Sequence, residues 1–141
     1  MCRVGHPGGV VAGYVWDFAA ERSPTGPIRL GLNFIGTKPP LAPGTEDSRL
    51  EALSSLFTGG GLQDIATRTI DVTMSFPDFN DFWRTQTPAF SPTGKVIVSL
   101  SDTDREKLIE SVRARLPAGP DDSVAYSARA NAIKARVPER N

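Results

Sequence analysis

The chain has 141 residues, with 16 lysines and arginines against 16 aspartates and glutamates, and so carries no net charge. This length suits one domain, and the absence of any basic or acidic block argues against a nucleic-acid partner. A single cysteine, Cys2, and a single histidine, His6, exclude an intramolecular disulfide and disfavour a zinc site or a histidine-based triad.

No apolar run approaches the roughly 18 residues that a membrane-spanning helix requires. No signal peptide precedes the first apolar stretch either. We therefore expect a cytoplasmic protein without a membrane partner.

The first expected element is a strand over residues 9–16, which follows a turn at residues 7–9; residues 1–4 look like the end of a helix. The strand is almost wholly apolar, too short for a buried helix and without alternation, which is typical of a strand covered on both faces. In parallel α/β sheets, ligands bind beyond the carboxyl ends of such strands. Trp16 and Asp17 stand at this end, where they either contact a ligand or simply terminate a core strand.

Residues 19–45 are rich in proline and glycine and form a candidate lid, since long loops in compact domains are either functional or poorly ordered. An apolar island within this segment suggests a broken helix. A clear helix is expected over residues 48–58, where Ser48 and Glu51 fit a capping box. Its apolar face favours packing over binding, and the glycines at residues 59–61 end it.

Residues 62–76 alternate between apolar and polar side chains and are rich in β-branched residues, which predicts a long strand. Arg68 is the exception on its apolar face. A short helix with Asp78 as N-cap follows. Its aromatic residues Phe82 and Trp83 could line a pocket mouth, or the aromatic face could cap the core.

Residues 85–100 are expected to form a second loop insertion. A helix over residues 102–116 is capped by Ser101. Residues 123–137 alternate again and form the final strand. Their many small side chains predict a layer packed closely against that strand.

In this order, the stretches resemble the C-terminal half of a class I S-adenosylmethionine-dependent methyltransferase, nearest to the small-molecule group. The motifs are Met-x-Arg-Val-x-x-Pro-Gly-Gly, the strand ending in Val15-Trp16-Asp17, the helix at residues 50–57, and Gly60-Gly61-Leu62 before a strand. The resemblance covers essentially the whole chain and makes residues 1–141 one partial domain. It implies an α/β, Rossmann-like fold with two main helices, an inserted helical segment and one mixed sheet, formed by strands 9–16, 62–76 and 123–137.

The resemblance implies S-adenosylmethionine as cofactor, but the family's binding motif is absent. That motif is a glycine-rich turn after the first strand and an acid that ends the second. The glycines at residues 59–61 follow a helix and precede a strand, so they are no substitute. No cofactor-binding residue can be assigned, and the chain is expected to be truncated and inactive by itself.

For the acceptor, a small molecule, the expected contacts are Trp16, Phe82 and Trp83, with Asp17 as a base or merely a loop cap. In the family the last strand lies antiparallel between the two before it. Residues 123–137 would then leave one edge of strand 9–16 open. An open apolar edge invites pairing, so we expect self-association there.

Three functions remain open from the sequence. The first is methyl transfer to a small acceptor that the loops at residues 19–45 and 85–100 would select. The second is a non-catalytic binding or assembly module of methyltransferase descent, and the third is an unrelated small α+β ligand-binding fold. A strand covered on both faces favours the first, because a one-sided sheet does not need one.

Overall fold

The computed structural model describes residues 4–140, so the expected helix end at residues 1–4 lies almost entirely outside the described part. The described chain is a mixed α/β structure with a three-stranded sheet and five α-helices. In chain order the elements are β1 (Val10–Trp16), α1 (Gly26–Phe34), α2 (Leu50–Gly59), β2 (Gln63–Phe76), α3 (Phe79–Gln86), α4 (Pro92–Ser99), α5 (Asp102–Arg115) and β3 (Val124–Arg136), with short 3-10 turns at Glu46–Ser48 and Pro120–Asp122.

The strand order is β1-β3-β2, so the last strand lies between the other two, as expected. Ala132, near the middle of β3, pairs with Tyr14 on one side and with Arg68 on the other. The prediction of a mixed sheet is wrong for the described strands. Both neighbouring pairs are antiparallel, so the sheet is antiparallel. β1 and β2 do run parallel to each other, but β3 separates them and no parallel pair results.

The expectation that residues 9–16 form a strand covered on both faces is wrong for the described chain. β1 is an edge strand, and the side chains of Val10 and Tyr14 are 62% and 79% exposed. A continuous apolar run shows that both faces of a strand are apolar. The run does not show that other segments of the same chain pack against both faces.

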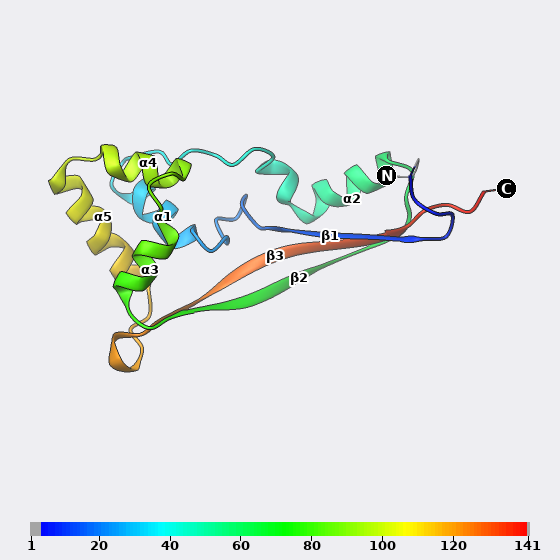
Figure 1. Ribbon diagram of the computed structural model, residues 1–141. Coiled ribbons are helices and arrows are strands. Elements are labelled where there is room, and N and C mark those ends of the chain that lie inside the picture. Colours follow the sequence, from blue (N-terminus) through cyan, green and yellow to red (C-terminus); the bar gives the residue numbers. More distant parts are fainter. Residues whose placement is uncertain (1–3, 141) are drawn as a thin grey trace.

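The helices α1, α3, α4 and α5 gather at one end of the long antiparallel pair β2–β3, whereas α2 lies along the sheet toward the end where the chain begins and ends (Figure 1). The helical cluster encloses the larger core, which contains Ile28, Leu32, Phe79, Phe82, Ile97, Leu108, Val112, Leu116 and Val124. At Gly31, a Cβ would lie 2.7 Å from Val112 Cγ2 and 3.0 Å from Leu108 Cδ1. Glycine therefore lets α1 approach α5 closely.

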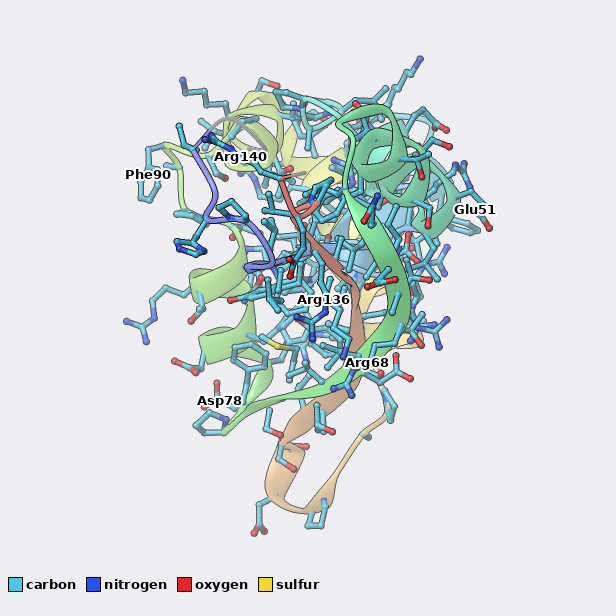
Figure 2. All side chains as sticks on the ribbon, turned by 90° about the vertical axis from the view of Figure 1, so that its right-hand side faces the viewer. Glu51, Arg68, Asp78, Phe90, Arg136 and Arg140 are labelled. Carbon is cyan, nitrogen blue, oxygen red and sulfur yellow. The ribbon has the colours of Figure 1, made fainter. Side chains whose placement is uncertain are left out.

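The two faces of the sheet have different cover. α2 packs on one face against Leu62, Ala135 and Val137, and it lies across the strands from α3 (Figure 2). On the opposite face, Phe76 and Tyr126 join the helical cluster at one end. We call the rest of that face the bare face; it is formed by Val10, Ala12, Tyr14, Trp16, Ala66, Arg68, Ile70, Val72, Ala132, Lys134 and Arg136.

Two of the expected helix caps are confirmed. Asp78 Oδ1 accepts a hydrogen bond from Asp81 N at 2.8 Å, and Ser101 Oγ accepts one from Asp104 N at 3.1 Å. Each side chain satisfies a backbone N–H that has no partner within the first turn of its helix. These caps depend on residues three apart, which explains why the sequence reveals them.

The expected capping box of Ser48 and Glu51 is wrong. The N-cap of α2 is Arg49, and no side chain caps this helix. Ser48 is buried and links other segments, because its hydroxyl accepts a hydrogen bond from Ala19 N at 3.1 Å and donates one to Thr45 O at 2.6 Å. The local sequence pattern predicted that Ser48 caps α2, but its hydroxyl makes hydrogen bonds to other segments instead.

Neither expected loop insertion is only a loop. The segment at residues 19–45 contains α1, and the segment at residues 85–100 contains α4. Both helices have a proline in their first turn, where its fixed φ and missing N–H cost nothing. The prolines mark helix starts here, which is why the composition alone suggested loops.

Candidate functional site

The described structure brings the two segments at residues 19–45 and 85–100 together around one pocket beyond the carboxyl end of β1. Its volume is about 370 Å³, within the range of small-molecule sites. We call it the loop pocket; it is lined by Phe18, Thr25, Arg29, Pro40, Leu41, Ala42, Pro43, Thr85, Gln86, Pro88, Ser91, Pro92 and Thr93.

An ion pair between the buried Arg29 and the partly buried Glu21 holds one wall of the loop pocket. Arg29, on α1, donates from Nε to Glu21 Oε2 at 2.7 Å and from Nη2 to Glu21 Oε1 at 3.2 Å. Its Nη1 donates to Pro40 O at 2.5 Å. One side chain thus fastens the start of α1, the turn before it and the loop after it. Because the partners are desolvated together, this bidentate pair is specific in its geometry.

The opposite wall is the junction between α3 and α4. Ser91 caps α4 by accepting from Gly94 N at 2.9 Å, and its hydroxyl donates to Pro88 O at 2.8 Å. Thr87 closes α3 by donating its hydroxyl hydrogen bond to Trp83 O at 2.6 Å. Each of these hydroxyls is already used by the backbone of its own turn.

The loop pocket offers a ligand few free charged groups. The Arg29 guanidinium is neutralised by Glu21, and the Ser91 hydroxyl is already bonded. The remaining surface is mostly proline, leucine, alanine and phenylalanine. This chemistry suits a neutral and largely apolar small molecule.

Trp16 and Asp17 stand next to the loop pocket in sequence but do not line it. Trp16 is the last residue of β1, and Phe18, two residues on, is the pocket residue. Asp17 Oδ1 accepts a hydrogen bond from Ala20 N at 3.2 Å. Asp17 therefore caps the turn after β1, which is one of the two roles that the sequence allowed.

Phe82 and Trp83 belong to the core rather than to a pocket wall. Phe82 has no exposed surface. Trp83 is partly buried and stacks on Phe79 with ring centroids 5.9 Å apart. α3 instead presents Thr85 and Gln86 to the loop pocket. The structure thus places none of the four expected site residues on the pocket wall.

An ionic cluster fixes the same end of the sheet on the α2 side. Arg129 Nε donates to Asp71 Oδ1 at 2.8 Å, and Arg22 lies 3.9 Å from the same oxygen. The hydrogen bond from Arg129 holds the pKa of Asp71 below its usual value. The pKa of Arg129 is raised by this hydrogen bond first and also by nearby Asp17. The cluster ties the turn after β1 to both long strands.

Tyr126 anchors the proline-rich segment from the other side. Its hydroxyl donates to Pro24 O at 2.5 Å, and burial raises its pKa well above the usual value. A buried tyrosine commonly satisfies its hydroxyl in this way. A tertiary hydrogen bond therefore holds the segment that leads into α1 against β3.

A larger but shallower trough of about 630 Å³ crosses the bare face. Its floor consists of the middle of all three strands, namely Ala12, Gly13, Tyr14, Ala66, Thr67, Arg68, Ala132, Ile133 and Lys134. Strand residues form this floor, and none of the helices and loops that the structure describes contributes to its lining. We therefore take the loop pocket, which has two built walls, as the candidate ligand site.

The residues that line the loop pocket were not identified individually from the sequence. The available signal was the composition of the two long segments, which pointed to a lid and a second loop. What placed them together was the packing of α1 against α5 and of α3 against β2, which spacing along the chain does not encode.

Within residues 4–140, no cluster of three or more acidic, histidine or cysteine side chains could hold a metal ion. None of the helices that the structure describes combines the length and apolar character needed to cross a bilayer. The sequence matches no protein-family model and no curated protein.

Proposed function

We propose that this chain is the acceptor-binding part of an S-adenosylmethionine-dependent methyltransferase, and that the loop pocket binds a neutral, largely apolar acceptor. The supporting observation is the strand order β1-β3-β2. Two strands run in the same direction, α2 connects them along the chain, and the last strand inserts antiparallel between them. This is the arrangement that the resemblance implies for the end of the domain.

The exposure of β1 removes one argument for this proposal, because the strand is not covered within the described chain. The position of the loop pocket supplies another. It lies beyond the carboxyl end of β1, at Phe18, which is where ligands bind in open α/β sheets.

The described residues do not fit the cofactor. β1 leads into α1 through residues 17–25, which contain no glycine, so no glycine-rich turn lets the backbone approach a nucleotide there. The methyl donor would have to be held by residues other than those described, either in a longer parent chain or in a second polypeptide. In the family, the strand that carries such a half pairs with the outer edge of β1.

The residues of this chain would bind and orient the acceptor. Positioning alone can supply a large part of a transfer rate. Trp16 and Asp17 do not line the loop pocket, so the contact with the acceptor from the end of β1 would come from Phe18. Trp83, which packs against the larger core and stacks on Phe79, would hold α3 in place at this wall.

Ligand binding provides the first test. 2-Naphthol, a neutral aromatic phenol, should bind the purified chain in a fluorescence titration, and Phe18→Ala should weaken that binding about ten-fold through lost apolar contact. Phe34→Ala is the control, because Phe34 is exposed and does not line the loop pocket. Equal affinity in the Phe18 variant would contradict the assignment of the pocket.

The cofactor is tested separately by thermal unfolding with about 1 mM S-adenosylhomocysteine. We expect an unchanged Tm, because a ligand raises Tm only when it binds the folded state. A rise in Tm would mean that a cofactor site exists in this chain after all. Translation of the DNA upstream of Met1 then asks whether a strand and glycine-rich turn precede it in frame.

The alternative function is a non-catalytic binding or assembly module. The open edge of β1 and the bare face favour it. The aromatic residues at 79–83 do not, because Phe79 and Phe82 are buried. A functional ribosome-binding site directly before Met1, without an upstream glycine-rich turn, would favour this alternative over the enzyme.

A further inference from the structure

The outer edge of β1 presents backbone groups without a neighbouring strand. Asp17 N donates to Arg129 O at 2.8 Å, and Val137 N donates to Gly9 O at 2.9 Å. Because bonded and non-bonded pairs alternate along an antiparallel ladder, the odd-numbered residues of β1 bond to β3. The N–H groups of the even-numbered residues therefore point outward, as do the carbonyls; these residues are Val10, Ala12, Tyr14 and Trp16.

The two edges of the sheet differ in their protection. Native edge strands are commonly blunted by charges, prolines or bulges. β2 has charged residues, Arg68 and Asp71, and its register shifts between Gln63 and Ala66. The sequence of β1, VVAGYVW, contains neither a charge nor a proline, and its pairing with β3 is regular. Only the β1 edge is thus suited to further pairing.

Nothing within the described chain requires a glycine at position 13, the centre of β1. A Cβ added there would meet no heavy atom within 4 Å, and its φ is not left-handed. Glycine within a strand is destabilising relative to alanine and often marks the close approach of another backbone. Since β3 is the only described strand beside Gly13 and leaves the space at its Cβ position open, a further backbone would approach from outside residues 4–140.

We propose that a second copy of this chain pairs with β1 in the antiparallel direction, with the two-fold axis at Gly13. Ala12 then lies opposite Tyr14 of the second copy, and Val10 lies opposite Trp16. The outward N–H and C=O groups of both strands bond to each other, and two three-stranded sheets become one of six strands. Gly13 faces itself in a non-bonded pair, where the two Cα atoms are about 4.5 Å apart.

Charge favours this edge pairing over stacking of two bare faces. Arg68 and Arg136 lie on the side of the strands away from α2 (Figure 2), and Lys134 lies between them in the sheet. Arg136 lies 3.9 Å from Asp64, whereas β2 places no acid on this face beside Arg68 and Lys134 between Ala66 and Met74. Face-to-face stacking would bury like charges together, whereas edge pairing leaves them in solvent.

The expected interface is small. Seven residues per copy, with Tyr14 as the largest exposed side chain, belong to the low end of stable interfaces. We expect dimerisation at micromolar concentrations, visible as a rising mass in sedimentation velocity between about 1 and about 200 µM. This inference depends only on the β1 edge and does not rest on the proposed methyltransferase function.

Disulfide cross-linking tests the register. In a Cys2→Ser background, Gly13→Cys should form a covalent dimer in air, because Cα atoms about 4.5 Å apart can be bridged. Ala12→Cys in the same background is the matched control. In the proposed register the two copies of residue 12 are diagonal neighbours about 7–8 Å apart, too far for a disulfide without movement. Equal cross-linking of the two variants would overturn the register.

Charge exchange tests the pairing without covalent chemistry. Gly13→Asp and Gly13→Lys should each weaken self-association at least about ten-fold, because like charges meet at the axis. An equimolar mixture of the two variants should restore the dimer, which also shows that both fold. Thr67→Asp, on the exposed part of β2, should leave self-association unchanged. A wild-type chain that stays monomeric at about 200 µM, or a Gly13→Asp variant that still dimerises, would overturn the proposal.

Discussion

The ring of Phe82 lies at the junction between the paired strands β2 and β3 and the helical cluster. It meets Phe76 and Tyr126 edge-on, with ring centroids 5.4 and 5.6 Å apart. Edge-to-face pairs of this kind add stability beyond the apolar area that they bury. Phe82 therefore connects the two halves of the larger core and has no surface left for a ligand.

Phe82→Ala should lower the free energy of unfolding by about 3–5 kcal/mol, because the lost contacts leave a cavity that the neighbours only partly fill. Urea unfolding followed by tryptophan fluorescence measures this change. Phe90→Ala, at a ring that is 82% exposed, is the control and should stay within about 0.5 kcal/mol. A Phe82 variant of nearly native stability would instead identify the ring as part of an accessible site.

At the scale of elements, α5 combines several favourable end interactions. Asp102 and Asp104 lie in its first turn and Arg113 and Arg115 in its last, so each charge has the sign that the helix dipole favours. Arg113 also lies 3.9 Å above the ring of Phe79. These interactions stabilise α5, whose buried Leu108 and Val112 meet α1 at Gly31, where glycine permits close contact.

Ser101→Ala removes the side chain that caps α5 and should cost about 1 kcal/mol, since Asp104 N loses its partner. The midpoint of urea unfolding reports the loss. Ser55→Ala is matched to it in chemistry but lies at an exposed interior position of α2. That control should be neutral or slightly stabilising, because alanine is the better helix former. Equal losses in the two variants would contradict the assigned cap.

At the scale of the whole molecule, the chain has a well-packed end and an open end. The helical cluster encloses one end of the paired strands β2 and β3, while at the other end α2 is the only described helix and covers one face (Figure 1). β1 adds an unprotected edge to the open end. Either a second copy or a polypeptide that supplies the cofactor half could pair there, and the two would compete for the same edge.

If a second copy pairs with β1, the Tm of the chain should rise by several degrees between about 2 and about 100 µM, because only folded chains associate. Differential scanning calorimetry at both concentrations measures the shift. Gly13→Asp should show the same Tm at both. A wild-type Tm that does not depend on concentration would mean that the edge stays unpaired over this range.

The candidate site was predictable only in outline. The segments at residues 19–45 and 85–100 were expected to select a ligand, and they do meet in the loop pocket. The individual residues were not predictable, because Leu41 and Thr85 become neighbours of one cavity only through helix packing. Phe82 shows the converse, since an aromatic residue at a helix face looks the same in sequence whether it lines a pocket or fills a core.

The sequence by itself determined what depends on residues a few positions apart. The caps at Asp78 and Ser101, the glycine stop after α2 and the alternation of β2 and β3 all arise from local hydrogen bonds or side-chain periodicity. The resemblance added the strand order. The tertiary structure decided which side chains are covered. In it β1 is exposed, Phe82 is buried, and Ser48 bonds to Ala19 N instead of capping α2. Burial is a property of contacts between distant segments, and a local pattern records only which surfaces are apolar.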